Sequence, residues 1–258
     1  MPRTSMRNDL SIYDDHADEW WRPESKWFRS LFAVNAFRLA LLDDWIGPLP
    51  AGATVVDLGC GGGFFCEPFA RRGARVVGCD RSFRSVAAAR AHWDGADHGA
   101  EHGAGGGAAA RGAAPNYLRA DVTHAPLASG CADLVLLADV LEHVDDPCGA
   151  LAEAGRLLKR GGRLYVNTVA RTMTARLLVV HVAETLGLIP RGTHDPNRFI
   201  DRAELIRWAG DRGLTAERVV GEAVAVGATL RTRTVQLRRS PSTRMAYSVL
   251  FRKVAPGG

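Results

Sequence analysis

The sequence contains no run of about 18 or more uncharged apolar residues, and it therefore predicts no transmembrane helix. Its first residues, MPRTSMRNDLSIYDD, lack the apolar segment that a secretory signal requires. Five cysteines occur, but none belongs to a CxxC pair or to a His/Cys cluster. These absences argue against membrane-spanning, secreted and zinc-binding classes, and they predict a cytoplasmic protein with reduced thiols.

Acidic residues are absent from Ala223 to Gly258, although the net charge of the whole chain is only +5. Such a basic end could contact nucleic acid, an anionic membrane or an acidic ligand, or it could be a solvated face. Because no aromatic-rich nucleic-acid motif accompanies it, we expect no nucleic-acid partner. The basic residues of this segment are Arg231, Arg233, Arg238, Arg239, Arg244, Arg252 and Lys253.

A chain of 258 residues, 47% of them hydrophobic, can bury one sizeable core. Residues 1–50 are expected to form an N-terminal helical cap, and residues 51–170 the core of the domain. Residues 95–115, mostly Gly and Ala, are expected to be a disordered insertion in that core. Residues 171–200 are expected to cover a substrate or face a membrane, and residues 201–258 to complete the sheet.

From residue 53 onward, short β-branched runs alternate with segments of helical periodicity. This alternation predicts an α/β fold with a doubly wound, Rossmann-like, mostly parallel sheet, followed by a C-terminal antiparallel hairpin. The predicted strands are 53–58, 74–80, 116–122, 132–140 and 162–169, with hairpin strands 228–237 and 243–254. The predicted helices are 25–46, 64–72, 82–93, 147–159, 173–189 and 201–213.

A glycine-rich loop follows the first predicted strand, in the stretch DLGCGGG. Gly59, Gly61 and Gly63 lack a Cβ atom, so a ligand can approach the backbone closely there. Asp80 and Asp121 end the second and third predicted strands. Ligands of such sheets bind at the carboxyl ends of the strands, where Asp80 could accept hydrogen bonds from a ribose. Asp121 could accept from an exocyclic amine or cap a turn.

The loop could bind either of two nucleoside cofactors, a nicotinamide dinucleotide or S-adenosylmethionine. A dinucleotide fingerprint needs a third glycine where this chain has Phe64, which weakens a nicotinamide-dependent oxidoreductase. Asp57, just before the loop, would repel a pyrophosphate but would attract the ammonium and sulfonium groups of S-adenosylmethionine. The acids therefore favour S-adenosylmethionine, while a tight turn without a ligand is the structural alternative.

Several motifs resemble the class I S-adenosylmethionine-dependent methyltransferases, and among them the ubiquinone-biosynthesis O-methyltransferases. The resemblance implies the class I methyltransferase fold, and a polyprenylated hydroxyphenol or catechol as the methyl acceptor. It also implies cofactor contacts at Arg38, Gly59, Asp80 and Ala138, the last through the backbone. The matching pieces are DEWW, FAVNAFRLALL, VVDLGCGGGFF, VVGCDRSF, LADVLEHVDDP, LKRGGRLYVNTVART and PRGTHDPNRFID.

The motif ADVLEHV carries the candidate catalytic residues Asp139, Glu142 and His143. Their spacing would place them on one face of a helical turn after the fourth strand. The resemblance implies that they are Mg²⁺ ligands, with Asp139 standing where the family has Glu, and Mg²⁺ would activate a catechol. Two alternatives stay open: His143 acts alone as a general base, or Glu142 and His143 only shape the turn.

The acceptor side of the molecule is predicted less directly. The apolar helix 173–189, flanked by arginines, could dip into an anionic membrane or pack over the pocket. His194 and Asp195 could face the acceptor or stabilise their turn. We therefore expect an O-methyltransferase acting on a small phenolic molecule that could be prenylated. The alternatives are a methyltransferase of specialised metabolism and a non-catalytic nucleoside-binding or scaffold protein.

Overall fold

The computed structural model describes residues 8–95 and 112–254, so most of the Gly/Ala-rich segment 95–115 lies outside the described residues. The strands are β1 Thr54–Leu58, β2 Arg75–Asp80, β3 Asn116–Arg119, β4 Ala132–Ala138, β5 Leu158–Val169, β6 Leu214–Val224, β7 Leu237–Ser240 and β8 Ala246–Lys253. The α-helices are α1 Ser11–Asp15, α2 Arg29–Ile46, α3 Cys66–Arg71, α4 Phe83–Gly95, α5 Pro147–Leu157, α6 Met173–Ala175, α7 Arg202–Gly210 and α8 Val226–Thr232. The other helical segments are the 3-10 helices η1 Ala17–Glu19 and η3 Pro196–Arg198 and the π-helix η2 Arg176–Ala183.

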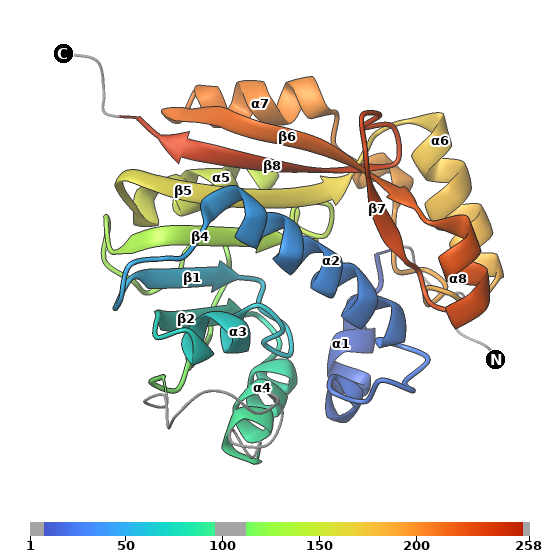
Figure 1. Ribbon diagram of the computed structural model, residues 1–258, viewed down its shortest axis with the longest axis horizontal. Coiled ribbons are helices and arrows are strands. Elements are labelled where there is room, and N and C mark those ends of the chain that lie inside the picture. Colours follow the sequence, from blue (N-terminus) through green and yellow to red (C-terminus); the bar gives the residue numbers. More distant parts are fainter. Residues whose placement is uncertain (1–7, 96–111, 255–258) are drawn as a thin grey trace.

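In the described part of the chain the strands form one eight-stranded sheet in the order β3-β2-β1-β4-β5-β8-β6-β7 (Figure 1). The first five strands pair in parallel, and the chain reverses its direction of winding between β1 and β4. The C-terminal strands pair antiparallel. The predicted doubly wound, mostly parallel sheet with antiparallel C-terminal strands is therefore confirmed.

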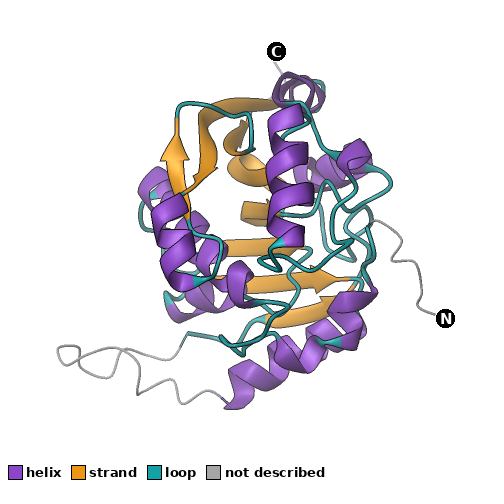
Figure 2. Ribbon diagram, turned by 90° about the vertical axis from the view of Figure 1, so that its right-hand side faces the viewer, coloured by secondary structure: helices purple, strands orange, loops and turns teal. Residues whose placement is uncertain are grey.

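Helices lie on both sides of the sheet (Figure 2), and each side has its own apolar core. Alternating residues of β1 explain why both faces are covered, because Val56 and Leu58 face one core while Val55 faces the other. Helices α5 and α7 pack on the first side, and α2, α3 and α4 pack on the second. Neither face is left for solvent, so the ligand-binding edge lies at the strand ends.

The pairing of the C-terminal strands differs from the expected hairpin. β8 lies between β5 and β6, and β7 pairs with β6 instead of β8. Residues 226–232 form α8, although their β-branched neighbours had predicted a strand. The missed strand is β6, whose apolar pattern is interrupted by Glu217, Arg218 and Glu222. Pairing on both sides overrides the weak local pattern of this segment.

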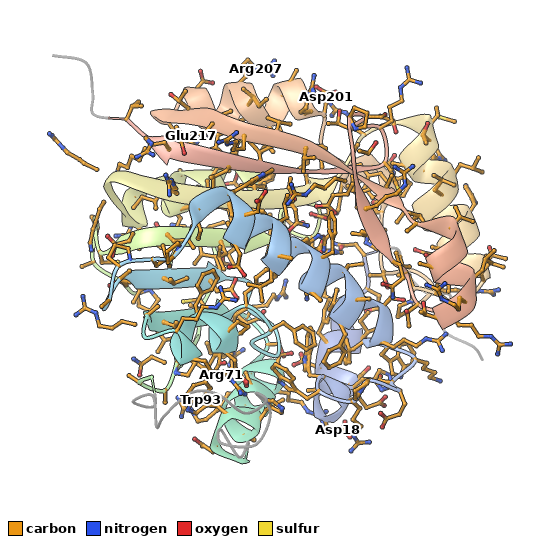
Figure 3. The ribbon with its side chains drawn as sticks, viewed as in Figure 1. Asp18, Arg71, Trp93, Asp201, Arg207 and Glu217 are labelled. Atoms are coloured by element: carbon orange, nitrogen blue, oxygen red, sulfur yellow. The ribbon has the colours of Figure 1, made fainter. Side chains whose placement is uncertain are left out.

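Side chains cap the first turns of two helices. Ser82 Oγ accepts a hydrogen bond from the backbone N–H of Ser85 at 2.9 Å. Asp201 caps α7 (Figure 3), where its Oδ1 accepts from the N–H groups of Ala203 and Glu204. The predicted helix 173–189 forms in its first part only, as α6 and the π-helix η2, while residues 186–189 form a turn. No helix among the described residues is long and apolar enough to span a bilayer.

Candidate active site

The glycine-rich loop turns sharply at the carboxyl end of β1. Gly59 has φ +82° and Gly61 φ +49°, in the left-handed region where a side chain is strained. A Cβ atom at Gly59 would come within 2.4 Å of a methyl group of Val140, so no other residue fits without a shift. Gly63 is similarly confined, by the hydroxyl of Tyr117. The loop is thus held against β3 and the turn after β4, and Gly61, Gly62 and Gly63 are buried.

Asp80 stabilises this loop from the end of β2. Its Oδ2 accepts a hydrogen bond from Gly61 N–H at 2.9 Å, and its Oδ1 accepts from Ser82 N–H at 2.8 Å. Burial raises the pKa of Asp80, and these two backbone bonds oppose the shift. Each oxygen retains further lone pairs, so the carboxylate can still accept from a ribose hydroxyl.

Asp57 lies inside the sheet, in β1, with 2% of its surface exposed. The Cys66 thiol donates a weak hydrogen bond to its Oδ2 across 3.5 Å. Burial raises the pKa of Asp57 to about 7, the Cys66 bond counteracts this, and the charge of Asp80 raises it further. Asp57 therefore influences the glycine loop from within the sheet, through its charge and its packing.

Asp121 is exposed, and it caps a turn after β3. Its Oδ1 accepts from the backbone N–H of Thr123 at 2.8 Å and from the hydroxyl of the same residue at 2.6 Å. These bonds lower the pKa of Asp121. Of the two roles open to it from the sequence, the turn cap is the one that the contacts support.

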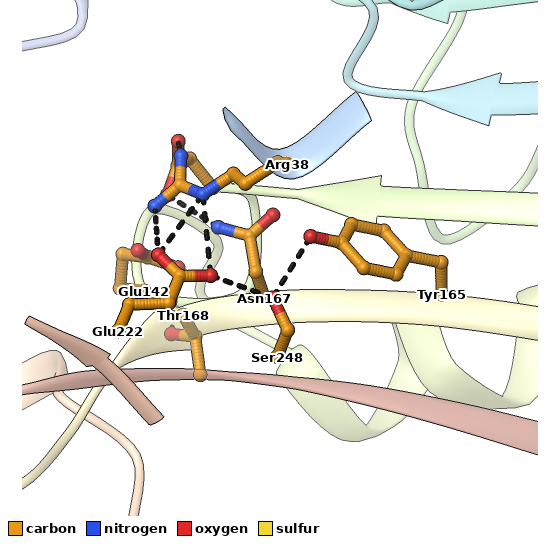
Figure 4. Close-up of polar contacts among 8 residues, drawn as sticks. Arg38, Glu142, Tyr165, Asn167, Thr168, Glu222 and Ser248 are labelled. Carbon is orange, nitrogen blue, oxygen red and sulfur yellow. Dashed lines mark hydrogen bonds and ion pairs between the residues drawn. The ribbon is translucent and has the colours of Figure 1, made fainter. Parts of the chain in front are cut away.

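Arg38, on α2, is buried at the centre of a polar network (Figure 4). Its guanidinium donates to both oxygens of Glu222 on β6, at 3.0–3.4 Å, and forms an ion pair with Asp139. Ser248 Oγ donates to Glu222 Oε1 at 2.6 Å and meets the Tyr165 hydroxyl at 2.8 Å. The network joins α2 to β4, β5, β6 and β8, and it fixes Arg38 at the strand ends.

Asp139 follows β4 with φ +53°, a strained backbone for a residue other than glycine. Its carboxylate is held on two sides, because Asn167 Nδ2 donates to Oδ1 at 2.7 Å while Arg38 pairs with Oδ2. Ala138, one residue earlier, ends β4 in register with Asn167. The side-chain contacts explain how the strained turn persists.

Glu142 is fully buried beside Asp139. Thr168 Oγ1 donates to its Oε2 at 2.8 Å, while Oε1 meets no hydrogen-bond donor among the described residues. Burial raises the pKa of Glu142 to about 8, and the charge of Asp139 adds to the shift. The structure therefore brings these two predicted carboxyl groups together.

His143 points to a different neighbourhood. Its Nδ1 lies 2.7 Å from Oδ1 of Asn8, and its ring centroid lies 5.5 Å from that of His194. Burial lowers the pKa of His143 to about 4, with a further contribution from the charge of Arg198. The imidazole is therefore neutral at neutral pH, and it is separated from the carboxyl pair that precedes it.

The three predicted magnesium ligands do not fit a metal ion in this arrangement. The described residues contain no group of three or more His, Cys, Asp or Glu side chains placed to hold one. Asp139 is engaged by Arg38, whose positive charge opposes a cation, and Thr168 occupies Glu142 Oε2. His143 turns toward Asn8. We therefore derive no catalytic step through a metal.

The side chains around this turn do fit a cationic cofactor. Glu142 Oε1 and Asn167 Oδ1 are buried acceptors that meet no donor among the described residues. Burial raises the pKa of Tyr13, and the negative charges of Asp139, Glu142 and Asp80 raise it further. An ammonium group would supply donors to such acceptors, and a sulfonium would be attracted by the acids.

Residues 8–28, which we term the N-terminal strap, cover the glycine loop. The Trp20 ring lies so close to Gly61 and Gly62 that a Cβ atom on either would be 2.7 Å from it. Trp20 Nε1 donates to Ser85 Oγ at 3.0 Å, and Trp21 Nε1 donates to the carbonyl of Gly62 at 2.8 Å. The strap therefore packs directly on the surface that the glycines expose.

Sequence reasoning missed Glu222, Asn167, Thr168 and Asn8. Asn167 and Thr168 carried a usable signal, because they are polar residues at the end of an apolar parallel strand. Glu222 and Asn8 carried none, since their partners lie 184 and 135 residues away in the chain. The ring centroid of His194 lies 5.5 Å from that of His143.

Comparisons with known proteins agree with this geometry. The family model described as "Methyltransferase domain" matches residues 56–166. Two solved structures share the fold. A possible histamine N-methyltransferase of Thermotoga maritima has a TM-score of 0.61 and 21% identity, covering 94% of this chain and 98% of its own. Magnesium protoporphyrin IX methyltransferase of Synechocystis, with bound S-adenosylhomocysteine, has a TM-score of 0.62 and 19% identity, covering 94% and 96%. Fold and loop thus define a class I S-adenosylmethionine-dependent methyltransferase.

Relatives of known name narrow the class. A ubiquinone biosynthesis O-methyltransferase of Sodalis glossinidius is 35% identical over 216 residues, 83% of this chain and 80% of its own. The protein of that name from Pseudomonas paraeruginosa is 35% identical over 217 residues, 83% and 85% of the two chains. The chain belongs to the family of the ubiquinone biosynthesis O-methyltransferases, and S-adenosylmethionine is its cofactor.

Proposed function

We propose that this enzyme transfers a methyl group from S-adenosylmethionine to the hydroxyl oxygen of a phenol or catechol. The observation that carries the proposal is the imidazole of His143 on the turn after β4, which Asn8 holds through a 2.7 Å contact to Nδ1 and which burial keeps neutral at neutral pH. A neutral imidazole can take the proton of a phenol as its oxygen attacks. The names of the relatives support oxygen as the acceptor atom.

Each residue of the site has its own role in this methyl transfer. Bound S-adenosylmethionine supplies the methyl group on a positively charged sulfur. Asp80 accepts from the ribose, and the acceptor atoms of Glu142 and Asn167 receive the ammonium end. Arg38, held by Glu222, fixes Asp139 and thereby the turn that carries Glu142 and His143. The main catalytic effect is alignment, because acceptor oxygen, methyl carbon and sulfur must be collinear.

A polyprenylated acceptor is the finer part of the proposal. Helices α6 and η2 and the turn after them expose Met173 by 77%, Leu177 by 57% and Leu186 by 63%. Their neighbours Arg171, Arg176 and Arg191 are basic. This surface would suit either a prenyl chain or the anionic membrane in which such an acceptor is dissolved. A small-molecule methyltransferase of specialised metabolism, acting on a short acceptor, is the alternative.

A methylation assay with radiolabelled S-adenosylmethionine tests these points. The acceptors are a catechol with a long polyprenyl chain in detergent and a short water-soluble catechol. We expect label in the ether product of both, with kcat/KM at least tenfold higher for the prenylated acceptor. Equal values would favour the short acceptor, and no O-methylation of either catechol would refute the proposed reaction.

Two further arms of the assay address the chemistry. His143→Gln should lower kcat by about 10²-fold, the usual contribution of a positioned general base. Chelation with EDTA should leave turnover unchanged, because Asp139 and Glu142 are engaged by Arg38 and Thr168. A loss of turnover on chelation, reversed by Mg²⁺, would restore the metal hypothesis and remove His143 from the role of sole base.

A further inference from the structure

Asn8, at the start of the strap, contacts His143 through both ends of its amide. Its Oδ1 lies 2.7 Å from Nδ1 of the imidazole, and its Nδ2 donates to the backbone carbonyl of His143 at 3.2 Å. The two residues are 135 positions apart in the chain. The contact therefore forms only when the strap lies on the turn after β4.

The chemistry of this pair defines where the proton of the imidazole resides. A carbonyl oxygen only accepts, so the group of Asn8 that faces it must be the NH₂ group. The opposite atom of the amide is then the acceptor Oδ1, and the Nδ1 atom that it meets must carry a proton. A neutral His143 held in this way has its lone pair on Nε2.

The surroundings of His143 offer no competing partner that would reverse this assignment. Among the described residues, Asn8 and the His194 ring face the imidazole, and the charge of Arg198 lowers its pKa. Arg198 donates to the carbonyl of Val144 at 3.0 Å and to Asp145 at 2.6 Å. Among the described residues, no hydrogen bond other than that from Asn8 reaches the imidazole nitrogens.

Other contacts hold Asn8 in place. The backbone N–H of Asp9 donates to the carbonyl of Gly192 at 3.2 Å, two residues before His194 in the chain. Asn8 itself has φ +61°, a conformation that asparagine tolerates better than most residues. Farther along the strap, Trp20 and Trp21 anchor it on the glycine loop. The segment that covers the cofactor surface is therefore the one that presents Asn8.

We propose that Asn8 is a positioning residue for the methyl transfer: it holds His143 in the Nδ1–H tautomer and leaves Nε2 free to accept the proton of the substrate hydroxyl. The inference rests on the proposed function, in which His143 is the base. It implies that the base is correctly oriented only when the strap is closed.

The first test needs no turnover. The full-length protein is labelled with ¹⁵N-histidine, and long-range ¹H–¹⁵N spectra report which nitrogen of His143 is protonated, with assignment by loss of the signals in His143→Gln. We expect the Nδ1–H tautomer in the wild type and in Asn8→Asp, which keeps the acceptor. Asn8→Ala should show a mixture or the Nε2–H form. An Nε2–H wild type would overturn the proposal, whether or not the enzyme methylates a catechol.

The second test is kinetic, with the short catechol and S-adenosylmethionine. We expect Asn8→Ala to lower kcat about tenfold with little change in KM, because the tautomer matters in the transition state. Asn8→Asp should recover most of the loss, and Asn8→Gly should behave like Asn8→Ala although it relieves the backbone strain. Ser11→Ala, in the exposed helix α1, is the matched control. An unchanged kcat in Asn8→Ala, in an active wild type, would refute the proposal alone.

Discussion

At the residue scale, the acids of the site differ in how they are used. Asp80 accepts hydrogen bonds from backbone N–H groups, and Asp139 pairs with Arg38. Asp57 is buried, and the Cys66 thiol is its one hydrogen-bond donor within the part of the chain that the structure describes. A buried carboxylate with so weak a partner is costly when it is charged. When Asp57 is ionised, it therefore lowers the stability of the fold and places a negative charge beneath the cofactor-binding loop.

This cost predicts that the unfolding free energy depends on pH. The folded pKa of Asp57, about 7, lies above the unfolded value of about 3.9, so the folded state binds the proton more tightly. The contribution of Asp57 to stability is full below pH about 4 and is lost as pH rises toward 7. Asp57→Asn stays neutral, so its unfolding free energy relative to the wild type should rise from pH 4 to pH 7. The slope is at most about 1.4 kcal/mol per pH unit.

Thermal or urea unfolding at pH 4, 5, 6, 7 and 8 measures this difference. Glu142 has a raised pKa as well, but it is present in both proteins and cancels in the comparison. Asp18→Asn, which removes an exposed carboxylate of the strap, controls for the change in net charge. Parallel stability curves for the wild type and Asp57→Asn would contradict the prediction.

At the element scale, the strap contacts both the glycine loop and His143. Trp21 stacks on His92 with ring centroids 3.7 Å apart, and His92 Nδ1 meets the buried carboxylate of Glu67 at 2.7 Å. The indole N–H of Trp21 also donates a hydrogen bond to the carbonyl of Gly62. Trp21 thus attaches the strap to α4 directly and to α3 through His92.

We therefore expect Trp21→Phe to loosen the strap without removing its stacking. The lost hydrogen bond is worth about 1 kcal/mol, so strap amides should exchange about fivefold faster. Amide hydrogen exchange followed by mass spectrometry measures this, with peptides of the sheet expected to be unaffected. Trp27→Phe is the control, because its ring stacks on His16 and not near the loop. Equal exchange in the two variants would mean that the Gly62 bond does not hold the strap.

The same scale shows what local sequence can and cannot predict. β1 to β5 and the helices between them were predicted because their apolar runs and caps are local signals. α8 and β6 were not, because tertiary pairing decided against their local pattern. In the site, the glycines and Asp80 followed from the rule that ligands bind at strand ends. The partners Glu222 of Arg38 and Asn8 of His143 required the folded chain, since they lie 184 and 135 residues away in the sequence.

At the scale of the whole molecule, apolar exposure and positive charge are unevenly distributed. Met173, Leu177 and Leu186 are exposed on α6, η2 and the turn that follows, and Leu230 is 71% exposed on α8. The last part of the chain, from Ala223 onward, carries only positive charges. Apolar side chains next to arginines are the combination that binds anionic bilayers.

Vesicle co-sedimentation tests this property of the surface. We expect the protein to pellet with vesicles containing about 30% anionic lipid, to bind neutral vesicles weakly, and to be released as salt is raised. Leu177→Asp should reduce pelleting several-fold. Phe83→Asp, which alters an exposed apolar residue on α4, should not. Equal pelleting of Leu177→Asp and wild type would exclude this helix from membrane contact.

The order of the strands also bears on synthesis at the ribosome. Glu222 and the inner strand β8 follow their partners Arg38 and β5 in the chain, so they emerge from the ribosome later. Until β8 emerges, a nascent chain has an open sheet edge at β5, and Arg38 lacks the carboxylate of Glu222. Chains that terminate before β8 are therefore natural targets for proteases and chaperones.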